Sequence, residues 1–147
     1  MSVSGLEDAV SRLGVSANRM FRLCGSTGMS TWMRPLRDGA LVVQAESDDA
    51  EFTIMLYGRA SPSDGESGGD IVQFSLPVKV EGEQSALESR LSEWNRRVIL
   101  SKAYLDPEGD VMLDLSVPLI SATDESLSEL LVLWRRLVSE FMSFLAS

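Results

Sequence analysis

Acidic side chains gather in one short stretch of the chain, Asp106-Pro107-Glu108-Gly109-Asp110, and their oxygens could bind a cation. A calcium loop requires a longer run of alternating acidic positions and a distal glutamate that binds through both oxygens. This stretch has neither feature, whereas a Pro-Glu-Gly sequence is typical of a tight turn. The stretch is therefore predicted to be a hairpin turn rather than a metal site.

Two other positions have side chains or spacing that invite a chemical interpretation. Gly25-Ser26-Thr27-Gly28 is weakly glycine-rich, but it lacks the lysine and the spacing of a phosphate loop and follows no clear strand. Cys24 stands near Arg22 and Arg34 in the sequence, and nearby cations lower a thiol pKa. No histidine is available as its base, so Cys24 is interpreted as a buried or incidental thiol.

The chain has no histidine and one cysteine, which removes whole classes of chemistry. Zinc sites of the usual Cys/His type are excluded, as are Ser-His-Asp and Cys-His catalysis. An enzyme would have to rely on carboxylates or on Tyr57 and Tyr104 alone. We therefore predict that the protein is not an enzyme, with no catalytic residue, no cofactor and no metal.

Length and charge define the broad class of the protein. A chain of 147 residues with 44% apolar and 24% charged residues predicts a single globular domain over residues 1–147. The net charge of −9 disfavours nucleic acid and anionic membranes as partners, and it is interpreted mainly as a solubility device. No run of 18 apolar residues and no secretory signal is present, so a cytoplasmic location is expected.

Hydrophobic spacing predicts the elements that must position any site. An N-terminal helix is expected over residues 4–13. Residues 14–39 are the least readable part: Met20 to Leu23 could be a short strand or a helical turn, residues 25–30 are expected to be a loop, and Trp32 and Met33 are expected to pack. Alternating apolar residues predict three strands, and Pro77 indicates an edge strand or a bulge in the third. A second helix and a hairpin follow. The expected bounds of these elements are 40–45, 51–57 and 71–80 for the strands, 83–98 for the helix, and 99–105 with 111–117 for the hairpin.

The last helix, expected over residues 124–145, has an apolar arc broader than one sheet face usually needs. Two interpretations stay open: deeper burial inside a monomer, or a surface for a homodimer or another protein. The arginine pairs 96–97 and 135–136 are interpreted as a solvated rim, with orientation of an acidic partner as the alternative. The residues expected to bind a partner are Trp134, Leu137, Phe141 and Phe144.

The element order is thus α-β-β-β-α-β-β-α, which predicts an α+β fold with an antiparallel sheet packed by helices. The loop over residues 61–70 has no apolar side chain and is expected to be mobile.

The later part of the chain resembles the YbjN family. The resemblance rests on Trp94-Asn95 at a helix end, Ala103-Tyr104-Leu105-Asp106, Gly109-Asp110, the alternating strand that follows and the long last helix. It covers about the last 60 residues well and the first 80 by element order. The family is described as bacterial sensory-transduction regulators with a fold similar to type III secretion chaperones, which bind partly unfolded effectors as dimers. The resemblance implies a fold and a binding role, and it supplies no catalytic residues.

From these observations we expect a non-enzymatic protein-binding module, a chaperone-like protein or regulatory adaptor that acts as a homodimer. It would capture a partner polypeptide through an apolar helix or sheet surface. The alternative is a small-molecule or signal-sensing regulatory domain with a pocket between the sheet and the last helix.

Overall fold

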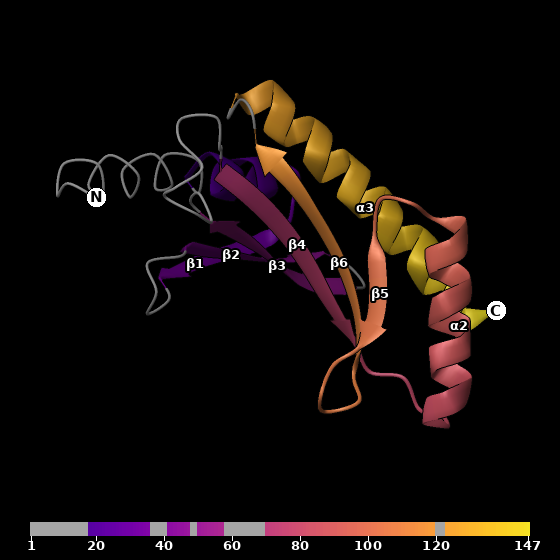
Figure 1. The fold of residues 1–147 in the computed structure, drawn as a ribbon. Helices are drawn as coiled ribbons and strands as arrows, with labels where there is room; N and C mark the ends of the chain where they lie inside the picture. The colour runs from indigo at the N-terminus through magenta and orange to yellow at the C-terminus, as the bar shows by residue number, and fades with distance from the viewer. Residues whose placement is uncertain (1–17, 36–40, 48–49, 58–69, 120–122) are drawn as a thin grey trace, which may run out of the picture.

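The computed structural model describes residues 18–35, 41–47, 50–57, 70–119 and 123–147 (Figure 1). A helix over residues 18–26 comes first, and two helices and six strands follow. They are β1 (Ser30–Pro35), β2 (Leu41–Ser47), β3 (Ala50–Tyr57), β4 (Asp70–Val78), α2 (Gln84–Arg97), β5 (Lys102–Leu105), β6 (Val111–Leu119) and α3 (Asp124–Ala146).

The six strands form one antiparallel sheet in the order β1-β2-β3-β4-β6-β5. The predicted α+β class and antiparallel sheet with packed helices are confirmed. The helix over residues 18–26 agrees with the helical alternative for Met20 to Leu23, whereas strand β1 is an addition. Trp32 and Met33, which were expected to pack, are exposed on that strand. The helix expected over residues 4–13 and the loop expected over 61–70 lie outside the described residues, except for Asp70, which begins β4.

The register of the strands separates an apolar face from a polar one. Val43 pairs with Ile54, Ile54 with Phe74 and Phe74 with Leu115, so these four buried side chains form one row across four strands. Because side chains alternate along a strand, the neighbouring residues point to the opposite face. That opposite face has polar side chains such as Thr53, Ser75 and Asp114. The core therefore lies on one side of the sheet.

Helix α3 covers the apolar face and carries much of the core (Figure 1). Its first turn is capped by Thr123, whose side-chain oxygen accepts a hydrogen bond from the backbone N–H of Ser126. Trp134 packs between two strand residues, edge-on to Phe52 at 5.8 Å and stacked on Phe74 at 5.4 Å between ring centroids. These ring contacts fix the position of the helix on the sheet.

The two outer strands end the sheet in different ways. At β5, the side-chain amide of Asn95 on α2 donates to the backbone carbonyl of Ala103 at 2.8 Å and accepts from its N–H at 2.7 Å. Asn95 thus takes the place of a neighbouring strand, and the edge of β5 is covered by α2. No described strand or helix makes such contacts with the outer edge of β1.

Pro77 lies in an interior strand, so the prediction of an edge strand is wrong for β4 as a whole. The physical reason is local: β4 pairs with β6 from Asp70 to Val78, but it pairs with β3 only as far as Ser75. Pro77 therefore has a strand partner on one side only. The expected start of the hairpin also shifts, because Ile99 and Leu100 are exposed and strand β5 begins at Lys102.

Candidate functional site

A hollow among the described residues lies where β3 and β4 separate, and it has a volume of about 470 Å³. Pairing between these strands ends at Thr53 and Ser75, although β3 extends back to Ala50 and β4 forward to Val78. Pairing continued in the same register would place Glu51 opposite Pro77. Proline has no backbone N–H to donate to a neighbouring strand, so the ladder stops and the strands part.

The pocket combines an apolar floor with charged side chains at its mouth. Phe52, Leu76 and Met142 contribute apolar surface, and Met142 comes from α3. Glu51 and Lys79 are exposed at the opening, and Asp110 lines it from the turn between β5 and β6. Strands β2, β3 and β4, the turn between β5 and β6, and α3 therefore all line one hollow between the sheet and the last helix. Its size and lining are those of a site for a small molecule or for a side chain of a partner.

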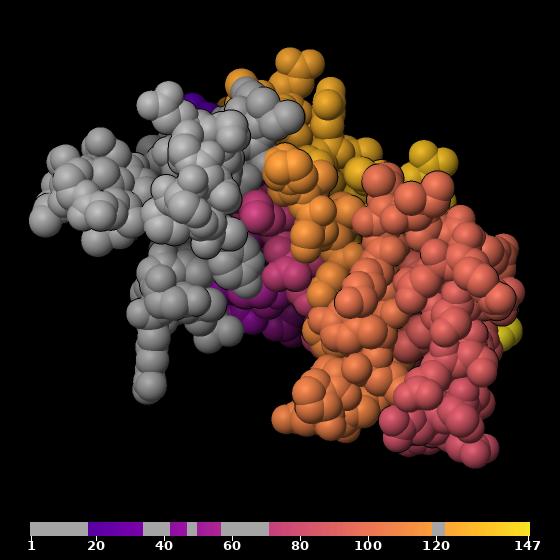
Figure 2. Space-filling view, viewed as in Figure 1, coloured from indigo at the N-terminus to yellow at the C-terminus, as the bar shows by residue number. Residues whose placement is uncertain are grey.

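Figure 2 shows atoms of β4 beside those of β6 on the side of the sheet turned to the viewer. The polar face of the sheet has a hydrogen-bonded cluster of side chains around Asp114. One carboxylate oxygen accepts from the Ser75 hydroxyl at 2.7 Å and the other from the Tyr104 hydroxyl at 2.6 Å. Lys102 places its ammonium 5.3 Å from the centre of the Tyr104 ring. Burial first, and then the hydrogen bond and charge of Asp114 and the charge of Asp106, raise the pKa of Tyr104 to about 12.

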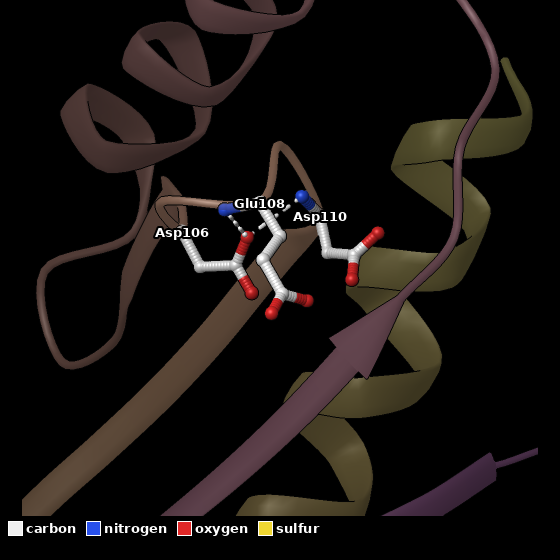
Figure 3. Close-up of side chains that lie close together, drawn as sticks. All are labelled: Asp106, Glu108 and Asp110. Atoms are coloured by element: carbon white, nitrogen blue, oxygen red, sulfur yellow. Dashed lines mark hydrogen bonds between the residues drawn. The ribbon is translucent and has the colours of Figure 1, made fainter.

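The acidic turn between β5 and β6 is held by its own side chain (Figure 3). One carboxylate oxygen of Asp106 accepts from the backbone N–H of Glu108 at 2.9 Å and from that of Asp110 at 2.8 Å. Gly109 has a φ of +88°, a conformation that favours glycine. The predicted hairpin turn is confirmed. The turn accounts for the grouping of the carboxylates of Asp106, Glu108 and Asp110 within 4.8 Å of one another.

The residues expected to bind a partner lie on the inner side of α3. Trp134, Leu137 and Phe141 are buried in the core, and Phe144 is half-buried. Phe141 packs edge-on against Trp94 of α2, with ring centroids 4.9 Å apart. Contact with a partner through these four side chains stays a prediction, and their burial means that α3 would first have to move away from the sheet or from α2.

Phe144 is the most accessible of the four and lies between α3 and α2. Its ring is 5.5 Å from that of Trp94, and the guanidinium groups of Arg90 and Arg97 lie 5.2 and 6.0 Å from its centre. Arg90 also donates to the Phe144 carbonyl near the end of α3. These contacts tie the C-terminal end of α3 to α2.

Cys24 is buried at the end of the helix over residues 18–26. Burial raises the pKa of its thiol to about 11, and the opposing effect of the Arg135 charge is smaller. The thiol is therefore protonated at neutral pH, as the interpretation of a buried thiol requires. Gly25 and Ser26 end this helix and Thr27 and Gly28 form the turn after it, where the N–H of Gly28 donates to the Gly25 carbonyl at 3.2 Å.

A comparison with protein families matches residues 6–147 to YbjN, described as "Putative bacterial sensory transduction regulator". The chain belongs to the YbjN family. No curated protein and no solved structure matches the chain. The match extends the resemblance seen in the sequence to nearly the whole chain, including residues 14–39.

The Trp94-Asn95 pair, on which the resemblance to YbjN partly rests, has a structural role. Trp94 donates from its indole N–H to the buried Ser101 hydroxyl at 3.0 Å, and Asn95 pairs with the backbone of Ala103. Asn95 therefore joins α2 to β5, and Trp94 joins α2 to the residue just before β5. No described helix of this YbjN protein is long and apolar enough to cross a membrane.

Sequence reasoning did not find the residues of the pocket between β3 and β4. They come from five places in the chain, Gln44 of β2 among them, so no local spacing joins them. Pro77 was the one local signal, and it indicated an irregularity in the strand without showing that a hollow would form there.

Proposed function

We propose that this YbjN protein is a non-enzymatic regulatory adaptor that acts as a homodimer and binds a segment of a partner polypeptide at the pocket between β3 and β4. The family description as a regulator supports a binding role. The observation that carries the proposal is the parting of two strands over an apolar floor. An extended segment can hydrogen-bond to unpaired strand edges while one of its side chains enters the pocket.

The charges around the pocket indicate what kind of segment fits. Glu51 and Asp110 bring two carboxylates to the opening, and Lys79 brings one cation. The whole chain has a net charge of −9. A segment with an apolar anchor residue flanked by basic residues would therefore complement the site, because charge complementarity favours encounter and orientation.

Replacing Met142 with glutamate tests the proposal directly. Met142→Glu places a charge on the apolar floor, so retention of the partner from a native lysate should fall sharply. Val132→Glu is the matched control, since Val132 lies on the same helix and is 68% exposed. Thermal melts of both variants establish that each is folded before capture is compared.

Equal capture by Met142→Glu and the wild-type protein would place the partner elsewhere and overturn the proposed site. Loss of capture in both variants would show a general effect of negative charge on α3, and it would also contradict the proposal.

The same pocket favours one other function, the sensing of a small molecule. A volume of about 470 Å³ falls within the range of ligand sites, and the lining joins apolar and charged groups between the sheet and α3. A ligand that binds only the folded state raises the melting temperature of the pure protein. That increase should disappear in Met142→Glu and persist in Val132→Glu.

A further inference from the structure

Strand β1 is one end of the described sheet. It has six residues, Ser30 to Pro35, and pairs with β2 along its whole length, while its outer edge faces no described strand. The other end of the sheet is closed by Asn95. An exposed edge presents unpaired backbone groups, and many proteins protect such edges with charges or by covering them.

Two large apolar side chains of this strand are exposed. Trp32 and Met33 are 38% and 39% exposed, and they lie on opposite faces of the strand. The Trp32 indole N–H donates to the Gln44 side chain on β2 at 2.7 Å, which holds the ring against the sheet. No acidic residue occurs in β1, although the chain as a whole carries a net charge of −9.

We propose that the β1 edge binds the β1 edge of a second copy of this chain, antiparallel and with Trp32 at the two-fold axis. The proposal names the surface by which the proposed regulator forms its homodimer. Its test does not need the partner polypeptide, so failure of the β1 surface can be distinguished from failure of the pocket between β3 and β4.

Symmetry limits the register of such a pair. Residues directly opposite each other in an antiparallel pair point to the same face, so the axis must pass through a residue and its own copy. An axis at Met33 would pair Pro35, which has no N–H, with Thr31. An axis at Trp32 instead pairs residues 30–34 with one another and leaves Pro35 outside the paired stretch.

Charge favours the same register and a second copy as the occupant. With the axis at Trp32, Arg34 of one copy stands opposite Ser30 of the other. Ser30 pairs with Glu46 on β2 of its own sheet. By register alone, the position of a cationic residue in each copy thus lies one strand away from the position of an acidic residue in the other. Pairing of opposite charges in the sequence favours a second copy as the occupant.

Disulfide cross-linking tests both the surface and the register. In either kind of antiparallel pair the two Cα atoms at the axis are about 4.5 to 5.5 Å apart, within the range that a disulfide spans. Trp32→Cys should therefore form a covalent dimer rapidly on mild oxidation. Met33→Cys is the matched control, because Met33 is equally exposed on the same strand but would face Thr31 rather than its own copy. The wild-type protein, whose Cys24 is buried, should stay uncross-linked.

Light scattering on the unmodified chain completes the test, since substitution of Trp32 itself removes contact surface. We expect twice the mass of one chain at high concentration, lost in Trp32→Glu and retained in Ile99→Glu, where the original residue is 91% exposed but far along the chain from β1. A wild-type monomer at all concentrations would overturn the proposal. Equal cross-linking of Trp32→Cys and Met33→Cys, or a dimer that survives Trp32→Glu, would overturn it as well.

Discussion

At the scale of single residues, Asp114 shows how one carboxylate sets the chemistry of its neighbours. Both of its oxygens accept hydrogen bonds from hydroxyl groups, Ser75 on one side and Tyr104 on the other. The sequence placed Tyr104 on a strand and Asp114 among the alternating residues of the next strand. It could not show that the two meet, because their contact depends on the register of the hairpin.

Tyr104 should titrate at high pH, with a pKa of about 12 against an ordinary value of 10. Burial and the adjacent Asp114 charge both oppose formation of the phenolate. Asp114→Asn removes that charge, so the Tyr104 pKa should fall while remaining above 10 because burial persists. Ultraviolet absorbance of the phenolate during a pH titration measures the change.

Glu108→Gln is the control for this titration, since Glu108 is not among the groups that shift Tyr104. The raised pKa of Tyr104 also makes the free energy of unfolding depend on pH. The folded state holds the proton more tightly than the unfolded state, so the contribution of Tyr104 is complete below pH 10 and is lost as the pH rises towards 12. A Tyr104 pKa unchanged in Asp114→Asn would contradict the contact between these two side chains.

At the scale of elements, the sequence predicted the bounds of a strand or helix most accurately where one face of that element is buried. Strands β3 and β6 and helices α2 and α3 begin and end within two residues of their expected bounds. Strand β1 had no readable pattern for a physical reason: as an edge strand it exposes Trp32 on one face and Met33 on the other, so no alternation marks it.

Asn95 joins two elements, because its side chain bonds to the outer backbone edge of β5. Asn95→Ala should lower the free energy of unfolding by about 2 kcal/mol, since two hydrogen bonds to the backbone of Ala103 are lost. Amide hydrogen exchange at Ala103 should accelerate in the same variant. Chemical denaturation measures the first effect.

Arg96→Ala is the matched control for Asn95, because Arg96 is the next residue on α2 and is exposed. Its substitution should change stability by less than about 0.5 kcal/mol. Equal stability of Asn95→Ala and Arg96→Ala would mean that the β5 edge does not depend on the amide.

At the scale of the whole molecule, the broad apolar arc of α3 follows from two packing partners. Trp134 meets Phe52 and Phe74 of the sheet, whereas Phe141 meets Trp94 of α2. A helix between a sheet and another helix needs apolar side chains over a wider arc than one that packs on a sheet alone. The sequence showed the width of the arc, but it could not distinguish a second helix of the same chain from a second protein.

Phe141→Ala should therefore destabilise the monomer by about 3 to 5 kcal/mol, as truncation of a fully buried aromatic ring does. Val132→Ala on the exposed side of the same helix should change stability by less than about 0.5 kcal/mol. Thermal or chemical denaturation of the two variants measures the difference. A folded, equally stable Phe141→Ala would show that this side chain serves an interface rather than the core.

The central claim at this scale is that a partner segment binds at the pocket between β3 and β4. Hydrogen exchange of the protein alone and with its captured partner tests it most directly, because the claim concerns unpaired backbone groups. We predict that the partner slows exchange at Ala50–Phe52 and Leu76–Lys79, with the exception of Pro77, which has no N–H. Slowed exchange confined to α2, or to the outer side of α3, with these two segments unchanged, would contradict the account.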